Sequence, residues 1–311
     1  MPRATDPTAG EPTVSVVIAA YNAAPFIERA IRSALEQTLP VAEIIVVDDC
    51  STDATVQMVE NIGRQDDRVK LLTLPANGGP SEARNAGFAA ASGEWIAVLD
   101  ADDAYLPDRL AHLMPKSGDA DILADNLLSY DPEKDAASTF PGPTEYGWEQ
   151  IDLPTFADAR RKHRDFGLFK PVFRRSFLEE HKLRYPEDVR HGEDFLFVFE
   201  AIARGGRYWL NWQPGYLYTM RNSGWSRTQV DYRAMGRNLE ELAKRRDLDL
   251  PVAVQEKLAD RAAYTRNLHA RQELRDAFQQ GRLLRVLGLA SRNPRLWPMI
   301  GRNLHRVLFK A

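Results

Sequence analysis

The residues best suited to chemistry are short acidic clusters that follow apolar, β-branched runs. They read EIIVVDDCSTD from Glu43 to Asp53, WIAVLDADD from Trp95 to Asp103, and HGEDF from His191 to Phe195. A strand that ends in carboxylates delivers them to one edge of a sheet, where the ligands of open α/β folds bind. Because gathered carboxylates repel one another unless a cation offsets them, the pattern indicates a metal-bound, phosphate-bearing substrate.

The LDADD cluster, Leu99 to Asp103, is the most specific of these motifs. In an extended segment, Asp100 and Asp102 share one side and can together address a divalent cation and the ligand it carries. Oxygen ligands favour Mg²⁺ or Mn²⁺, which proteins commonly hold through one or two carboxylates plus substrate phosphates. The alternative interpretation is a solvated helix start with Asp103 as its cap.

Of the other two clusters, one can bind a nucleotide and the other can accept a proton from a substrate. Asp48 and Asp49 can recognise a base or ribose, although DDCSTD is equally good turn and helix-start chemistry. Glu193 and Asp194 stand at the head of an expected helix, where a carboxylate can deprotonate a substrate hydroxyl. The alternative there is an acidic first turn that the helix dipole favours. His191 is interpreted as a neighbouring polar residue rather than a metal ligand.

Two further segments contain candidate phosphate contacts. Asn77–Gly87 combines a glycine turn, a proline at a helix start and Arg84, and both helix N-termini and arginine suit phosphate. Tyr216–Thr228 places Arg221 and Arg227 in a polar loop that can close over a diphosphate. The alternatives are simple turn-and-cap punctuation for the first segment and an exposed basic loop for the second.

The elements that must position these residues alternate between two periods in the first part of the chain. Strands are expected at Val14–Ala20, Glu43–Val47, Val69–Leu74 and Trp95–Leu99. Helices are expected at Pro25–Gln37, Asp53–Arg64 and Pro80–Ala91. This alternation predicts a parallel sheet with helical crossovers.

After Asp103 the pattern changes. A short helix is expected at Leu106–Met114, a longer one from about Asp194 to Arg204, and strands at Asp121–Tyr130, Phe169–Phe173 and Arg207–Leu210. Asp131–Gln150 is rich in Pro, Gly, Asp and Ser and predicts a long loop, usually a binding or lid segment. From Asp231 onward the chain is expected to be helical, with a break near Pro294.

Length, charge and cysteine content narrow the class of protein. A chain of 311 residues fits one large domain or two modest ones, and a net charge of −3 argues against a nucleic-acid partner. The single cysteine, Cys50, cannot form an intrachain disulfide and is interpreted as a small residue in a tight loop. With no signal-peptide core and no run of about 18 apolar residues, a reducing, cytoplasmic location is expected.

The C-terminal segment from Ala277 to Ala311 contains no Asp or Glu. Its basic residues are Arg282, Arg285, Arg292, Arg295, Arg302, Arg306 and Lys310. An apolar stripe at helical spacing consists of Trp297, Ile300, Leu304, Val307 and Leu308. A basic amphipathic helix of this kind predicts peripheral contact with a membrane surface, whereas packing on its own domain is the alternative.

Taken together, AAYN (Ala19–Asn22), VVDDCSTD (Val46–Asp53), the Gly78–Gly87 segment, LDADD and GED resemble the family-two glycosyltransferases of the GT-A fold. The resemblance covers roughly residues 13–228, with the motifs in the expected order, and is strongest to bacterial exopolysaccharide enzymes of the succinoglycan glucosyltransferase type. It implies an α/β fold, a Rossmann-like and mostly parallel sheet flanked by helices. The implied parts are a tail at 1–12, a nucleotide-sugar half at 13–103, an acceptor half at 104–230 and a C-terminal helical extension at 231–311.

The resemblance also implies a role for each matching position. The nucleotide and its sugar and phosphates would be contacted by Ala20, Tyr21, Asp49, Arg84, Asp100, Arg221 and Ser226. Of these, Asp49 would bind the nucleotide base, and Asp100 would bind the ribose or the sugar. Asp102 would hold the divalent metal, Mg²⁺ or Mn²⁺. Asp194 would be the catalytic base, with Glu193 beside it in the acceptor site.

The function implied is inverting transfer of a sugar, with UDP-glucose as the expected donor, to a glycan or lipid-linked acceptor. The chain lacks the QxxRW motif of processive synthases, so a single transfer per encounter is expected. Many relatives carry a histidine near Arg221, so the resemblance does not extend to a third protein ligand for the metal. A nucleotidyltransferase is disfavoured, because its phosphate loop after the first strand requires Gly and Lys, and AAYNAAPF contains neither. A non-catalytic nucleotide-sugar-binding module is the other alternative, and the presence of all the proposed catalytic carboxylates argues against it.

Overall fold

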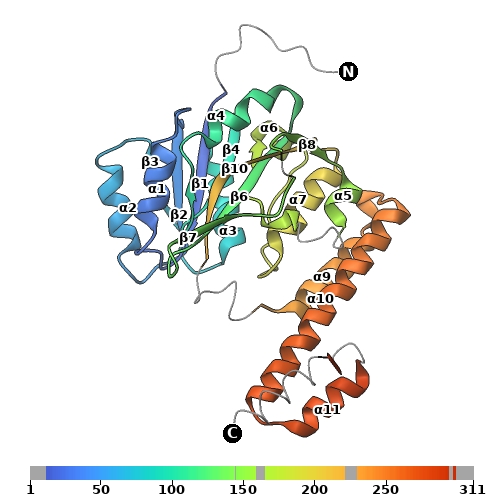
Figure 1. Cartoon of the computed structure of the whole chain (residues 1–311). Coiled ribbons are helices and arrows are strands. Elements are labelled where there is room, and N and C mark those ends of the chain that lie inside the picture. Colours follow the sequence, from blue (N-terminus) through green and yellow to red (C-terminus); the bar gives the residue numbers. More distant parts are fainter. Residues whose placement is uncertain (1–11, 144, 159–164, 221–229, 294–296, 299–311) are drawn as a thin grey trace.

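A computed structural model describes residues 12–143, 145–158, 165–220, 230–293 and 297–298 of the chain (Figure 1). The strands within these ranges join into one mixed, ten-stranded sheet. None of the helices described is long and apolar enough to cross a membrane.

The first part of the chain forms the parallel half of this sheet, as the sequence predicts. The strands are β1 (Val14–Ala20), β2 (Glu43–Asp48), β3 (Val69–Thr73) and β4 (Trp95–Asp100), and all three of their pairings are parallel. Helices α1 (Ile27–Leu35), α2 (Thr55–Gly63) and α3 (Pro80–Ala90) connect them. β1, β2 and β4 are buried almost without interruption, which is expected of strands covered on both faces.

The second part of the chain extends the same sheet. Its strands are β5 (Ala104–Tyr105), β6 (Ile122–Asp131), β7 (Ala136–Thr139), β8 (Trp148–Ile151), β9 (Val172–Arg174) and β10 (Tyr208–Thr219). The order across the sheet is β3-β2-β1-β4-β9-β6-β10-β5, with β7 beside β6 and β8 beside β10. β9 runs antiparallel to both β4 and β6 and joins the two halves.

Two expectations for this half are wrong. The long loop expected at Asp131–Gln150 contains β7 and β8, and every residue of β7 is exposed, so the strand carries no apolar alternation that would mark it. β10 does not end at Leu210 but continues to Thr219, because its pairing with β6 resumes after a register shift at Pro214. Proline and glycine commonly mark such irregularities within a strand.

The helices follow the predictions with shifted ends. α1 begins at Ile27 rather than Pro25, whereas α7 (Glu193–Ala203) lies where a helix was expected. α4 (Arg109–Leu113) is short and continues as the 3₁₀ helix η1 (Met114–Asp119). Three short elements were not predicted: α5 (Leu153–Ala157), η2 (Phe166–Leu168) and α6 (Arg175–Glu180).

The C-terminal region is helical but interrupted. α9 (Tyr232–Ala243), the 3₁₀ helix η3 (Arg246–Leu248) and α10 (Val252–Gln279) precede α11 (Leu283–Arg292). The first half of α10 joins the main core, whereas α11 folds back on its far end through a separate apolar cluster, away from the sheet (Figure 1). Pro294 and the predicted stripe from Ile300 to Leu308 lie outside the described residues.

Candidate active site

A buried arginine gathers three of the predicted carboxylates at the carboxyl end of β4. Arg84 on α3 donates through Nη2 to Oδ1 of Asp100 at 2.9 Å, and its Nη1 lies 3.2 Å from Oε1 of Glu193. The same Nη1 lies 3.1 Å from Oδ1 of Asp194. Residues from α3, β4 and α7, far apart in the sequence, therefore meet at one point.

A lysine that the sequence analysis did not single out completes this arrangement. Nζ of Lys170 lies 2.6 Å from Oδ2 of Asp194 and 2.9 Å from Oδ2 of Asp100. The side chain of Lys170 is 8% exposed, and those of Asp100, Glu193 and Asp194 are between 13% and 23% exposed. We call these four residues, together with Arg84, the carboxylate network.

The charges of the carboxylate network do not balance, because two cations face three carboxylates. Burial alone would raise the pKa of Asp100, but the charges of Lys170 and Arg84 outweigh it and hold that pKa well below its usual range. Burial and the neighbouring charge of Asp194 raise the pKa of Glu193. The network therefore combines an acid held firmly ionised with a neighbour that retains its proton more readily.

The glycine motif positions Arg84 through close packing. A Cβ at Gly87 would lie 2.4 Å from Cγ1 of Val17, so only glycine lets α3 approach β1 this closely. At the start of α3, Gly79 has φ of 90°, a conformation that favours glycine, and Pro80 takes the first helical position. The glycines therefore serve the turn and the packing, while Arg84 points into the site.

Asp49 holds this turn in place. Its carboxylate accepts hydrogen bonds from the backbone N–H groups of Gly78 and Gly79, both at 2.8 Å. Its own N–H donates to the carbonyl of Ala20 at 2.8 Å, so the loops after β1 and β2 are joined. Tyr21 follows Ala20 and is 47% exposed. Ala20, Tyr21 and Asp49 thus lie together at the ends of neighbouring parallel strands.

The LDADD cluster is bent rather than extended. β4 ends at Asp100, and the N–H of Asp103 donates to the carbonyl of Asp100 at 3.0 Å, which closes a turn around Asp102. The expectation of an extended Asp100–Asp102 segment is therefore wrong, because the strand stops before Ala101. Asp103 is not a helix cap either: its carboxylate accepts from Oη of Tyr216 and the N–H of Thr219, both at 2.8 Å.

The turn around Asp102 is tied to β10 by a second unpredicted residue. Arg29 of α1 donates to the carbonyl of Asp102 and, at 2.6 Å, to Oγ1 of Thr219. Within the described part of the chain, no three His, Cys, Asp or Glu side chains are grouped to hold a metal ion. A hard cation here would have to share one or two carboxylates with a substrate's phosphates, a common arrangement for Mg²⁺. The half-buried Asp102 fits that limited role.

Two predicted site residues cannot be placed. Arg221 and Ser226 lie outside the described residues, directly after the end of β10. Lys170, in contrast, was missed although a signal existed. It is a lone charge in the apolar segment Phe169–Phe173, and a buried lysine needs a carboxylate partner.

Comparisons with known proteins bear on the family and the fold of the chain. A model of glycosyl transferase family 2 matches residues 15–181, more than half of the chain. The succinoglycan biosynthesis protein ExoO of Rhizobium meliloti (strain 1021) is 42% identical over 221 residues, which cover 70% of this chain and 63% of that protein. ExoU of the same organism is 36% identical over 231 residues, covering 70% and 66%. The match thus spans about two thirds of these relatives' length.

A solved structure shares the fold. The crystal structure of S. aureus TarS 1–349 in complex with UDP-GlcNAc superposes with a TM-score of 0.64 at 22% identity, covering 81% of this chain and 72% of that one. The likeness establishes the GT-A type of α/β fold, with its mostly parallel sheet flanked by helices. Together with the family match and the ordered motifs, it identifies the chain as a member of glycosyl transferase family 2.

Proposed function

We propose that the protein transfers a sugar from a nucleoside-diphosphate sugar to a hydroxyl of a glycan or lipid-linked saccharide, with inversion at the anomeric carbon. The observation that carries this proposal is the meeting of Asp100, Glu193 and Asp194 around Arg84 and Lys170 at the strand ends. The succinoglycan role in the names of ExoO and ExoU supports a place in bacterial exopolysaccharide or cell-surface polysaccharide synthesis.

In this proposal Asp194 is the general base. Its Oδ2 accepts a hydrogen bond from Lys170. Its Oδ1 lies 3.1 Å from Nη1 of Arg84 but has no hydrogen bond to a described residue, and it is the oxygen we assign to the acceptor's proton. The acceptor oxygen attacks the anomeric carbon opposite the diphosphate, and the bond to the diphosphate breaks as Asp194 takes the proton. A single base without a covalent intermediate gives inversion, whereas a retaining glycosidase needs a paired acid and nucleophile. Glu193 lies beside the base, toward the acceptor.

The donor is proposed to be UDP-glucose. The UDP-GlcNAc in the TarS structure supports a uridine diphosphate, and the choice of glucose follows from the resemblance to succinoglycan enzymes. Asp49, with Ala20 and Tyr21, would bind the nucleotide base of the donor, and Asp100 would bind the ribose or the sugar. Because three carboxylates engage its guanidinium, we assign Arg84 to the positioning of Asp100 and Asp194 rather than to the phosphates.

A divalent metal would be held by Asp102 together with the diphosphate oxygens. When bound, Mg²⁺ or Mn²⁺ would neutralise charge that develops on the departing nucleoside diphosphate. The protein's own contribution there is the turn that Arg29 and Asp103 fix between β4 and β10. Arg221 and Ser226 are proposed to cover the diphosphate from the segment after β10.

The test is a donor panel. Incubation with UDP-glucose, UDP-galactose, UDP-GlcNAc and GDP-mannose, with Mn²⁺ or with EDTA, should release nucleoside diphosphate fastest from UDP-glucose and only with metal. The Asp194→Asn variant should lose about 10²–10⁴-fold in turnover, the range typical of a general base. Its thermal unfolding should stay close to that of the wild type, because Asp100 and Glu193 still face the two cations.

Two outcomes contradict the proposal. Full turnover in Asp194→Asn would remove the base from its assigned position. Calorimetry that finds UDP binding, but no turnover of any donor with any acceptor, would instead support a non-catalytic nucleotide-sugar-binding module.

We also propose peripheral contact with the inner face of the plasma membrane through the C-terminal helices. Leu283, Leu284 and Leu287 of α11 are 63%, 87% and 52% exposed, and Trp297 is 51% exposed. Arg282 and Arg285 are exposed neighbours of these residues in the sequence, and Arg285 also lies 3.2 Å from Glu273. We propose that this apolar and basic segment meets anionic lipid. In flotation with phosphatidylglycerol vesicles, the intact chain should float and a chain ending at Gln280 should not; equal flotation contradicts the contact.

A further inference from the structure

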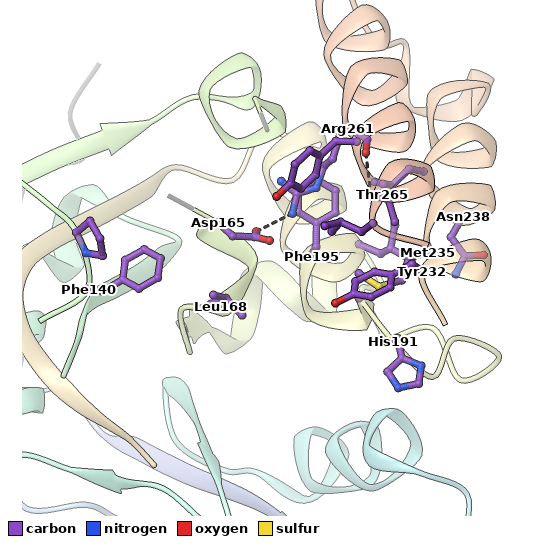
Figure 2. A pocket seen from close by; sticks show the side chains of 16 residues that line it. Phe140, Asp165, Leu168, His191, Phe195, Tyr232, Met235, Asn238, Arg261 and Thr265 are labelled. Atoms are coloured by element: carbon purple, nitrogen blue, oxygen red, sulfur yellow. Dashed lines mark hydrogen bonds and ion pairs between the residues drawn. The ribbon is translucent and has the colours of Figure 1, made fainter. Parts of the chain in front are cut away.

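A cavity of about 610 Å³ lies between the C-terminal helices and the region around the start of α7 (Figure 2). Arg261 and Thr265 of α10 and Met235 and Asn238 of α9 line one side of it. Phe140, Leu168 and Phe195 approach from the sheet, η2 and α7. This volume is within the range of small-molecule sites, about 300–1,000 Å³.

Some residues that line the cavity are close neighbours in the sequence of residues in the carboxylate network. Gly192, which lines it, immediately precedes Glu193 and Asp194, and Leu168 precedes Lys170 by two residues. Phe140 packs edge-on against Phe169, with ring centroids 5.5 Å apart. The segments that position the proposed base and its lysine partner therefore also form one wall of the cavity.

The lining is aromatic and close to neutral. Four aromatic side chains face the cavity: Phe140, Phe195, Tyr232 and Tyr264. Apart from His191, the described lining residues with a full charge are Arg261 and Asp165, whose Nη2 and Oδ1 lie 2.6 Å apart. Arg261 also stacks on Phe195, 4.0 Å from its ring centroid. Since this cation is already paired, a phosphate or carboxylate ligand would find no unpaired arginine or lysine among the described lining residues.

We propose that this cavity binds a neutral saccharide portion of the acceptor. A pyranose has C–H faces that pack on aromatic rings and hydroxyl edges that need hydrogen-bond partners, which Asn238 and Thr265 can supply. The Thr265 hydroxyl already donates to the carbonyl of Arg261 at 2.9 Å and can still accept from a sugar. A lipid chain would leave the Asn238 amide without a partner, at a cost. The inference rests on the proposed function and deepens it, because it assigns acceptor choice to α9 and α10. Both helices lie beyond the residues that the family model matches.

The test uses direct binding as well as transfer. Glucose, galactose, cellobiose and lactose are titrated into the full-length protein by saturation-transfer NMR, with glucuronic acid as the charged counterpart. Tyr264→Ala and Asn238→Ala should each lower the affinity for the most tightly bound neutral sugar by about tenfold. That is the effect of losing a well-placed contact of roughly 1.4 kcal/mol. UDP affinity, measured by calorimetry, should not change. Tyr146→Ala, an exposed tyrosine outside the cavity, is the matched control.

Each alternative result overturns the inference. It fails if no neutral sugar binds, if glucuronic acid binds more tightly than the neutral sugars, or if Tyr264→Ala binds them as well as the wild type. Loss of saccharide binding in Tyr146→Ala as well would also overturn it, since the effect would not be local. Failure of the proposed function is a separate result: the wild type would then neither bind UDP nor release it from UDP-glucose, whatever the saccharide titrations show.

Discussion

Arg84 and Arg109 are both buried arginines that pair with aspartates of the same sheet, but their surroundings differ. Arg109 is fully buried and donates from Nε and Nη2 to the carboxylate of Asp125 at 2.9–3.0 Å, beneath the rings of Tyr105 and Tyr216. One cation meets one carboxylate there. In the carboxylate network, Arg84 and Lys170 meet three carboxylates that remain partly exposed.

The difference separates a pair that holds the fold together from a group that can act on a ligand. The Arg109–Asp125 pair is closed and electrically balanced, and a Cβ at Gly215 would lie only 2.0 Å from Oδ2 of Asp125. No substrate can enter such a site. The carboxylate network carries an excess negative charge at the edge of the sheet, which a metal, a hydroxyl proton or a positively charged ligand can offset.

Removal of the lysine from the carboxylate network is expected to have the largest effect, a loss of turnover. In Lys170→Met, Asp100 and Asp194 lose one of the two cations they share, and Arg84 alone offsets their mutual repulsion, so the proposed base is displaced. Displacements of about 1 Å at a reacting centre can cost roughly 10²-fold in rate, and kcat should fall by at least that factor. The measurement is UDP release from UDP-glucose with a saturating acceptor.

The control for this variant is Lys257→Met. Lys257 is also an ion-paired lysine, 3.3 Å from Asp158, but it lies on α10 and is 27% exposed. Its removal should leave kcat nearly unchanged. Equal losses in the two variants would mean that Lys170 contributes only to general stability, and the distinction drawn between the two regions would not hold.

At the closed pair, the expected effect is on stability rather than on turnover. Asp125→Asn leaves the charge of Arg109 buried without a counter-ion, which typically costs about 3–5 kcal/mol of the free energy of unfolding. The double variant Arg109→Met/Asp125→Leu should recover most of that loss, because buried pairs are often replaceable by apolar residues of similar volume. Urea unfolding measures both.

Turnover of double variants distinguishes the Arg109–Asp125 pair from the carboxylate network. The Arg109→Met/Asp125→Leu protein loses the hydrogen bond from Arg109 to the carbonyl of Lys170. It should still release UDP, since Tyr216 can keep donating to Asp103 and accepting from the N–H of Asp100, and the Lys170 side chain keeps its carboxylate partners. The corresponding change in the carboxylate network, Arg84→Met with Asp100→Leu, should stay inactive even if the protein folds. Activity in the second double variant would contradict a catalytic role for the network.

The sequence predicted what depends on local pattern and on known motifs. The buried runs of β1, β2 and β4 predicted the parallel half of the sheet, a carboxylate at a strand end led to Asp100, and an acidic helix start led to Glu193 and Asp194. Lys170 was missed because the partners that stabilise a buried lysine, Asp100 and Asp194, come from distant segments. Contacts of that kind are set by the tertiary fold and leave only a faint local signal.

Edge strands and bends escaped prediction for a related reason. β7 is exposed on both faces and, among the strands described, pairs with β6 alone, so its sequence shows no apolar alternation. β10 passes through Pro214 and Gly215, which locally resemble a turn, and only its pairing with β6 carries it on to Thr219. In the LDADD cluster, the turn at Asp102 depends on hydrogen bonds from Arg29, Tyr216 and Thr219, none of them nearby in the sequence.

The smallest expected effects are opposite pH dependences at two glutamates, Glu43 in β2 and Glu193 at the start of α7. Hydrogen bonds from Lys70, Ser15 and Ser92 overcome the effect of burial and lower the pKa of Glu43 to about 2, from 4.5. Its ionised form therefore contributes stability above pH 4.5 that is lost as the pH falls toward 2. Glu43→Gln should lower the free energy of unfolding by about 2 kcal/mol at pH 7, and the gap should close on acidification.

Glu193 should behave in the opposite way. Burial and the charge of Asp194 raise its pKa above 4.5, so its contribution to stability is complete below pH 4.5 and is lost as the pH rises through the raised value. Glutamine resembles the protonated acid, so Glu193→Gln should match the wild type in acid and become the more stable protein at neutral pH. Thermal unfolding of both variants between pH 3 and pH 8 tests this. Parallel curves would mean that the excess negative charge does not destabilise the carboxylate network, and that a ligand is not needed to offset it.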